Sequence, residues 1–449
     1  MKKLLFLLLI CSISQVHAHE SKLPNIILIY ADDLGIGLLG HEGQKIITTP
    51  NIDQLAREGM RFKNAYSNMF CAPARASLLS GYTDIKKPNS ALSFSFTHGK
   101  LYQKMDNENI PLQSITDAID NTFPAPPKEQ VFLAQIAQVA GYTTSQFGKL
   151  DWGFSTTPNR LKRHGWDEHL GFMDHVNAHG FYPPYLFENG KIKYIEGNTI
   201  VGGGKSKEPE TAQAFKERWN RQGKKVYSQD IFIDALLKKI RTSQNSKSNK
   251  NNNNPFFIYF PTQLPHGPVS IPQVHKDFLN DGRLTQIEKE YASMVKRLDD
   301  DVGLIIEEVK AQGIEDNTII IFTADNGHEI YYSQHGRAEK PYRDVINGKH
   351  FDNYKAKFYS ERAKDVFNGN GSRAGLKQSN LQGGINVPLI VKWPSKIAAN
   401  TTSDRLVASY DMLPTIAEIV NYQANLSVDG LSYYQSFLGD NKRQAEKHN

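Results

Sequence analysis

The stretch Asn25-Ile-Ile-Leu-Ile-Tyr-Ala-Asp-Asp33 determines the fold class that we predict. Its apolar residues succeed one another without a polar break, which is typical of a strand buried on both faces of a parallel sheet. Asp32 and Asp33 come directly after this strand, where open α/β sheets place their ligand sites. An isolated Asp-Asp pair is more often a turn or a helix cap, so its meaning depends on the residues beyond the other strands.

Two further apolar runs also lead into polar residues. Residues 317–322 are followed by Asp325 and Asn326, and residues 255–260 are followed by His266. Like the acidic pair after the first strand, Asp325 and Asn326 offer hard oxygen donors, which suit Ca²⁺ or Mg²⁺ better than zinc or copper. Asp-Asn-Gly alone is a common turn sequence, but its place after a second apolar strand favours a metal site.

The remainder of the chain is consistent with a large α/β enzyme. Amphipathic helices are expected at residues 51–61 and 286–313, between the apolar strands. The 449 residues are 22% charged and 10% aromatic, which excludes a disordered tail or a coiled coil. A chain of this length can form two or three domains, but α/β enzymes of this size can be one. We expect one α/β domain over residues 19–449.

Residues 1–18 have the pattern of a secretory signal peptide. Two lysines precede a short apolar run, and Val16-His17-Ala18 is a small-residue cleavage site. The run is too short to span a bilayer and no later run is long enough, so we expect no membrane span and a periplasmic or secreted protein. Cys11 could mark a lipoprotein site, although Ile10 is bulkier than such sites usually allow. Cleavage would leave one cysteine, which cannot form an internal disulfide.

The remaining cysteine lies in Met69-Phe-Cys-Ala-Pro-Ala-Arg-Ala-Ser-Leu-Leu-Ser-Gly81. Pro73 is tolerated in a first helical turn. We therefore expect Cys71 at the N-terminus of a helix, where free amides and the helix dipole favour anions. Arg75 lies one turn later on the same face. The alternative is a structural role for Cys71, because free cysteine is usually a small buried hydrophobe.

The spacing Cys-x-Pro-x-Arg, followed by Ala-Ser-Leu-Leu-Ser-Gly, resembles the signature of type I sulfatases. In that family a maturation enzyme oxidises the cysteine to formylglycine (3-oxoalanine), whose hydrate is the nucleophile. The resemblance covers about residues 24–432, with five separated motifs in order. It implies an α/β fold like that of alkaline phosphatase, with a mostly parallel central sheet flanked by helices, and a bound Ca²⁺.

The resemblance also assigns roles to individual residues. His266 matches the histidine that touches the sulfate and protonates the departing oxygen, and Lys149 matches a lysine that contacts both nucleophile and sulfate. The complete catalytic set that it implies is Cys71, Arg75, Lys149, His266 and Lys377. The metal ligands that it implies are Asp32, Asp33, Cys71, Asp325 and Asn326.

The chain departs from the family pattern in three places. Asp151 stands where the family often has the histidine that expels sulfate, so either Asp151 takes that role, another histidine replaces it, or the register is different. Gln382 replaces a usual glutamate. After Ser432 we see nothing that could form the family's small C-terminal antiparallel subdomain, so we expect it to be missing, by truncation or by natural variation.

Three insertions and one polar loop interrupt the predicted domain. Residues 82–128 are expected to be an irregular surface excursion, residues 184–228 an outward-facing insertion with substrate contacts, and residues 330–372 a polar insertion. The Asn-rich residues 243–254 are too polar to order themselves and are expected to be a flexible loop. The residues that we consider for substrate binding, with ordinary loop packing as the alternative, are His179, His328 and Arg337.

These observations predict a secreted sulfatase that hydrolyses sulfate esters of a sulfated oligo- or polysaccharide. The extended loops resemble those of bacterial polysaccharide sulfatases, including enzymes for marine galactans such as carrageenan. One alternative is a phosphodiesterase or phosphonate hydrolase of the same superfamily. Another is a non-catalytic glycan-binding relative. We expect no nucleic-acid partner.

Overall fold

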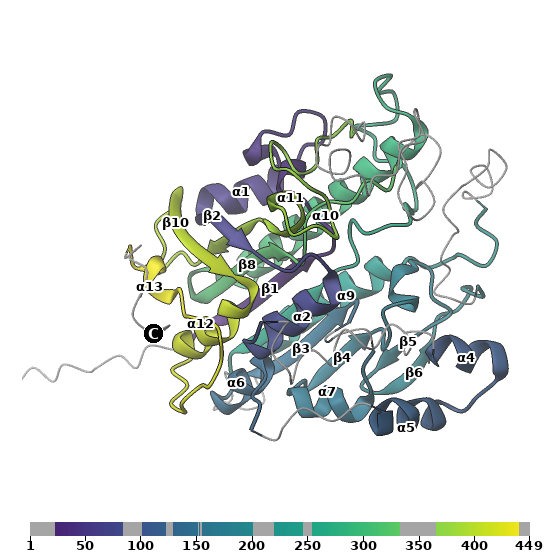
Figure 1. Ribbon diagram of the computed structural model, residues 1–449, viewed down its shortest axis with the longest axis horizontal. Helices are drawn as coiled ribbons and strands as arrows, with labels where there is room; N and C mark the ends of the chain where they lie inside the picture. Colours follow the sequence, from purple (N-terminus) through teal and green to yellow (C-terminus); the bar gives the residue numbers. More distant parts are fainter. Residues whose placement is uncertain are drawn as a thin grey trace, which may run out of the picture.

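The computed structural model describes residues 23–83, 101–122, 129–150, 152, 155–200, 220–245, 254–332 and 365–439. Its centre is a ten-stranded sheet in the order β10-β2-β9-β8-β1-β7-β3-β4-β5-β6 (Figure 1). The strands are β1 (Asn25–Ala31), β2 (Met60–Tyr66), β3 (Thr143–Gly148), β4 (Glu168–Gly171), β5 (Tyr185–Glu188), β6 (Lys191–Tyr194), β7 (Phe256–Pro261), β8 (Thr318–Ala324), β9 (Leu389–Lys392) and β10 (Thr401–Ala408).

The middle of the sheet is parallel. Strand β1 pairs in parallel with β7 and β8, and the parallel block continues from β7 through β3 to β4. Antiparallel pairs lie outside this block, where β9 joins β8 to β2 and where β5 joins β4 to β6. The predicted mostly parallel sheet is therefore confirmed, and five adjacent strands direct their C-terminal ends to one edge.

Helices cover both faces of this sheet, as expected from β1, which is fully buried along its length. Ile27 and Ile29 pack in one core with residues of α1 (Pro50–Glu58), α9 (Ser228–Asn245) and α10 (Gln286–Ala311). Ile26 and Leu28 point to the other face, because side chains alternate along a strand, and they share a second core with residues of three further helices. Those helices are α2 (Cys71–Ser80), α6 (Leu133–Val139) and α12 (Met412–Ile419). Each fully buried side chain of this kind contributes about 1.5–3 kcal/mol.

Two parts of the predicted domain differ from expectation. The excursion at 82–128 is not wholly irregular, because α4 (Leu101–Glu108) and α5 (Leu112–Thr122) are helices whose apolar residues, among them Tyr102 and Ile119, are buried. The insertion at 184–228 begins with the β5–β6 hairpin, which extends the sheet at its edge. The remaining short helices are α7 (Pro158–His164), α11 (Gln382–Ile385) and α13 (Tyr434–Phe437).

Several predictions fall outside the described residues. These are the signal peptide at 1–18, Asp151, Arg337 and most of the Asn-rich loop. Among the residues that the structure does describe, no helix is long and apolar enough to cross a membrane. The last helix of the described chain is α13, and the missing C-terminal subdomain stays a prediction.

Candidate active site

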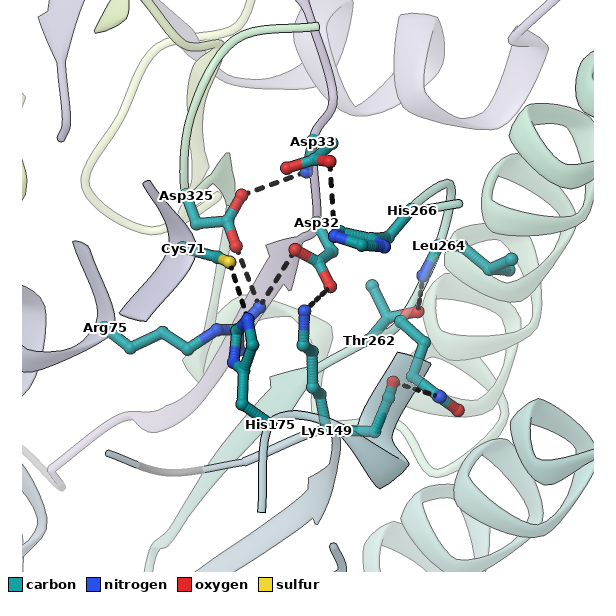
Figure 2. A network of polar contacts seen from close by, with 12 residues as sticks. Asp32, Asp33, Cys71, Arg75, Lys149, His175, Thr262, Leu264, His266 and Asp325 are labelled. Carbon is teal, nitrogen blue, oxygen red and sulfur yellow. Dashed lines mark hydrogen bonds and ion pairs between the residues drawn. The ribbon is translucent and has the colours of Figure 1, made fainter. Parts of the chain in front are cut away.

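Five adjacent parallel strands each deliver polar side chains to the same edge of the sheet. Because a parallel strand exposes its C-terminal end at this edge, the residues just beyond the strands meet there. These residues are Asp325 and Asn326 after β8, Asp32 and Asp33 after β1, His266 after β7, Lys149 after β3 and His175 after β4. Most of them point toward one another around the side chain of Cys71 (Figure 2).

Three carboxylates form the centre of the site. One oxygen from each of Asp32, Asp33 and Asp325 lies within 4.8 Å of the others, and all three residues are fully buried. The backbone N–H of Asp33 donates to Oδ1 of Asp325 at 3.0 Å. Nδ2 of the Asn326 side chain donates to Oδ1 of Asp33 at 2.7 Å. The Oδ1 atom of Asn326 takes no part in this hydrogen bond.

This cluster has the chemistry of a hard-cation site. Within the described part of the chain, Oδ1 of Asp32 and Oδ1 of Asn326 are buried and accept no hydrogen bond. Burial, together with repulsion from the neighbouring carboxylates of Asp32 and Asp33, holds the pKa of Asp325 well above its usual range. Carboxylate and amide oxygens are what Ca²⁺ and Mg²⁺ bind. The predicted ligands therefore fit a divalent cation. Such a cation would bind the two oxygens that accept no hydrogen bond and would offset the repulsion between the carboxylates.

Three buried cations balance the three carboxylates. Arg75 donates from Nη2 to Oδ2 of Asp325 at 2.9 Å, Lys149 contacts Asp32, and Lys377 Nζ lies 2.8 Å from Oδ2 of Asp33. Burial, the largest single effect, lowers the pKa of Lys377, but the charges of Asp33 and its acidic neighbours together outweigh burial and raise that pKa. A divalent cation added to this balanced set would leave the site positive, which suits an anionic substrate.

The side chain of Cys71 lies beside these charges. Helix α2 begins at Cys71 itself, so the predicted helix N-terminus is confirmed, one turn before Arg75. The sulfur is 4.0 Å from Nζ of Lys377 and 3.1 Å from Nε2 of His175. Burial raises the pKa of the Cys71 thiol to about 11. An unmodified thiol is therefore protonated at neutral pH and is a poor nucleophile, since the thiolate is the reactive form.

Three histidine rings line the site next to the cysteine. Nε2 of His266 lies 3.1 Å from Nζ of Lys377 and 3.5 Å from Oδ2 of Asp33. His179 stacks on His266, with ring centroids 4.1 Å apart and planes at 7°, and it meets the ring of His175 edge-on at 4.5 Å. The structure thus brings His266 and His179 together at this site, while His175 was not singled out from the sequence.

The other predicted contacts are placed differently. His328 is fully buried, and its two ring nitrogens lie 3.1 Å and 2.7 Å from the hydroxyl oxygens of Tyr291 and Tyr332, so its contacts favour a packing role beneath the acidic cluster. Arg337 is among the residues that are not described. Tyr331, which contacts the carboxylate of Asp33, was also missed, because a tyrosine in a polar insertion carries no signal of its own.

Comparisons with known proteins show the family to which this chain belongs. A family model described as Sulfatase matches residues 24–422. N-acetylgalactosamine-6-sulfatase of Mus musculus is 28% identical over 437 residues, which are 96% of this chain and 69% of that protein. The corresponding Rattus norvegicus enzyme is 28% identical over 92% of this chain and 66% of its own length, so this chain spans about two thirds of these relatives.

Two solved structures share the fold. Ps i-CgsB, solved in complex with k-i-k-neocarrahexaose, has a TM-score of 0.61 at 24% identity, with 93% of this chain and 77% of that chain covered. The phosphonate monoester hydrolase of Agrobacterium radiobacter has a TM-score of 0.53 at 16% identity, with coverages of 94% and 78%. The family model covers most of the chain, and the chain therefore belongs to the sulfatase family, a family of sulfuric ester hydrolases.

Proposed function

We propose that this chain hydrolyses sulfate esters of a sulfated carbohydrate, with residue 71 oxidised to formylglycine and Ca²⁺ bound by Asp32, Asp33, Asp325 and Asn326. The observation that carries the proposal is the position of Cys71. Its sulfur lies 4.0 Å from Nζ of Lys377, next to a buried acidic cluster in which Oδ1 of Asp32 and Oδ1 of Asn326 accept no hydrogen bond from the described residues. Nucleophile, cations and metal ligands therefore share one site.

The formylglycine hydrate would supply a hydroxyl nucleophile and a second hydroxyl that allows sulfate to be expelled again. The bound cation would stabilise negative charge on that nucleophile and on the sulfate oxygens. Arg75, Lys149 and Lys377 would hold the ester between fixed positive charges in a site from which water is excluded, where such charges act most strongly. Each of them is held in place by a buried carboxylate.

His266 is suited to donate a proton to the departing sugar oxygen. Its Nδ1 lies 2.5 Å from the carbonyl oxygen of Gly267, to which it donates, so the ring is oriented with Nε2 toward the site. Nε2 lies 3.1 Å from Nζ of Lys377 and 3.5 Å from Oδ2 of Asp33, so it faces the place where a sulfate ester held by Lys377 would put its leaving oxygen. General acid catalysis of this kind contributes about 10²- to 10⁴-fold.

The experiment is sulfate release from a panel of purified sulfated galactans and glycosaminoglycans, after co-expression with a formylglycine-generating enzyme. Mass spectrometry of the peptide that contains residue 71 reports its oxidation in the same sample. We expect formylglycine at residue 71 and sulfate release from at least one glycan. Release by a protein whose Cys71 is entirely unmodified would overturn the proposed nucleophile.

The panel also separates the alternatives. The fold likeness to a phosphonate monoester hydrolase motivates a side-by-side assay with an aryl sulfate, a phosphate diester and a phosphonate monoester. Faster turnover of the phosphate diester or the phosphonate monoester would favour a phosphodiesterase or phosphonate hydrolase. Glycan affinity and calcium binding without release of sulfate would favour a non-catalytic binding protein. Carrageenan, a substrate suggested by the ligand of Ps i-CgsB, is one member of the panel.

We further propose that the protein is exported to the periplasm or secreted, on the strength of the predicted signal peptide at residues 1–18. Fractionation of cells that express the full chain, with N-terminal sequencing of the exported form, tests this. An N-terminus at residue 19 is the expected result. A protein that stays in the cytoplasm with its first residues intact would contradict it.

A further inference from the structure

We infer that His175, from the loop after β4, is the base that expels sulfate from residue 71, in place of the histidine that the family motif carries at the position of Asp151. The inference rests on the proposed function, because it concerns the second half of that reaction. It names a residue at another position in the chain, on a different strand end, and the family motif does not point to it.

The first support is the contact itself. Nε2 of His175 lies 3.1 Å from Sγ of Cys71, within reach of a group attached to the same carbon atom. The His175 side chain is buried, as Cys71 is, so bulk water does not separate the two. Figure 2 shows the ring rising from its loop to meet the cysteine, beside Lys149 and Arg75.

The second support is the fixed geometry of the loop. Oδ1 of Asp174 accepts a hydrogen bond from the backbone N–H of Asn177 at 2.7 Å, which closes a tight turn around His175. Gln263, just beyond β7, donates from Nε2 to the carbonyl oxygens of Ala178 and Gly180 at 2.6 and 2.8 Å. The loop is therefore tied to the strand end that also carries His266. Preorganised placement of this kind is what a catalytic group requires.

The third support is the different position of each histidine ring relative to residue 71 and to the expected position of the ester. His266 is oriented toward Lys377 and Asp33, where the ester and its leaving oxygen would lie. His179 is stacked on His266 and is only half-buried. His175 is buried and contacts the side chain of residue 71 directly. This leaves His266 as the acid of the first step and His175 as the base of the second.

The expulsion step conserves its proton and its electron pairs. Nε2 of His175 accepts the proton of the free hydroxyl on Cβ of residue 71. The electron pair of that O–H bond forms the carbonyl double bond, and the bond from Cβ to the ester oxygen breaks with its own pair. Sulfate leaves as the dianion, and the proton stays on His175 until solvent removes it. One water molecule then hydrates the aldehyde again.

The test separates the two half-reactions. His175→Gln and His175→Ala are compared with the wild-type enzyme on an aryl sulfate and on the glycans of the panel. Intact-protein mass spectrometry monitors the enzyme after rapid acid quenching. We expect one aryl alcohol per enzyme to be released at once, a mass increase of one sulfo group that persists, and steady-state sulfate release about 10²- to 10⁴-fold slower.

Two further variants serve as controls. His169→Gln changes a buried histidine of β4 that lines a separate groove beside α9, and it should turn over like wild type with no persistent sulfo group. Asp151→Asn tests the rival base. Formylglycine content and thermal unfolding are measured for every variant, so loss of maturation or of folding is recognised, and His175→Gln keeps a polar side chain of similar size if His175→Ala unfolds.

Wild-type turnover by His175→Gln, or slow turnover without a sulfo group on the enzyme, would overturn the inference. So would a persistent sulfo group on Asp151→Asn but not on His175→Gln. These results leave the proposed function intact, because the wild-type enzyme still releases sulfate. A wild-type enzyme with formylglycine that releases no sulfate from any probe contradicts the proposed function itself.

Discussion

Two clusters of buried carboxylates in this molecule differ in the hydrogen-bond partners of their oxygens. The site cluster consists of Asp32, Asp33 and Asp325, and the helix cluster consists of Asp299 and Asp301 on α10. All five residues are fully buried. In the site cluster, Oδ1 of Asp32 and the neighbouring Oδ1 of Asn326 accept no hydrogen bond among the described residues. In the helix cluster, every carboxylate oxygen has a protein partner.

The helix cluster joins elements of the fold. Oδ1 of Asp299 accepts from the backbone N–H groups of Asn51 and Ile52, which are at the start of α1, at 3.0 and 2.8 Å. Asp301 accepts from Arg297 at 2.8 Å and from Gln229 at 2.7 Å, which ties α10 to α9. Burial of acidic groups is therefore common to structural and functional sites. What distinguishes the site cluster is a pair of buried oxygens that accept no hydrogen bond from any residue the structure describes, although Nη2 of Arg75 lies 3.7 Å from Oδ1 of Asp32.

The largest expected effect is the loss of sulfate release when Cys71, which lies beside the site cluster, is removed. Cys71→Ala removes the nucleophile, and steady-state sulfate release should fall by about 10⁴- to 10⁶-fold, as it does when other covalent nucleophiles are removed. Thermal unfolding should change little, because the side chain that is removed is small. Asp301→Asn, in the helix cluster, is the control and should retain turnover. Activity of Cys71→Ala above about one hundredth of wild type would contradict the assigned role.

The next effect should be on stability alone. Asp299→Ala leaves two N–H groups at the start of α1 without an acceptor and removes one partner of Lys296, which lies 3.1 Å away. We expect a loss of about 3–5 kcal/mol in the free energy of unfolding, the usual result of breaking a buried ion pair. Denaturant titration with and without Ca²⁺ measures it. A loss that disappears on adding Ca²⁺ would mean that the two clusters are not independent.

Metal addition tests the site cluster directly. A ligand that binds only the folded state at about 100 times its Kd adds about 2.7 kcal/mol of stability. We expect a gain of that size for wild type when Ca²⁺ is added to chelator-treated protein. Asp325→Asn removes one carboxylate and should abolish the gain, while Asp301→Asn should retain it in full. Equal gains in both variants would place the ion elsewhere.

The last effect, similar in size to that of the metal, is a pH dependence of the helix cluster. Burial raises the pKa of Asp301 from 3.8 to about 6, although Arg297 opposes the shift. The folded state therefore binds this proton more tightly than the unfolded state, so the stabilisation is present at low pH and is lost as the pH rises from 3.8 to about 6.

Relative to Asp301→Asn, which does not titrate, wild type should lose about 2–3 kcal/mol over that range. Denaturant titrations of both proteins at several pH values give this difference, which cancels the titration of all other groups. A constant difference would show that Asp301 has the same pKa in the folded and unfolded states, so that its interactions with Arg297 and Gln229 fully offset the effect of burial.

Prediction from sequence succeeded where local signals were strong. The central strands β1, β7 and β8 are apolar runs buried on both faces, so their ends, where the predicted metal ligands and His266 lie, were located in advance. Strand β4 has only four residues, Glu168–Gly171, and two of them are polar or charged. Nothing in the sequence marked its C-terminal end, so His175 had no topological context, although it precedes the predicted His179 by only four residues.

The sequence by itself determined the fold class, the buried parallel strands and most of the site, because burial on both faces demands long apolar runs and the sulfatase motifs lie just beyond them. Only the tertiary structure decided that His175, in addition to His266, lies beside residue 71. That choice depends on the order β8-β1-β7-β3-β4, which brings the loop after a short strand to the same edge as the long ones. Strand order arises from packing between distant segments, and no local pattern encodes it.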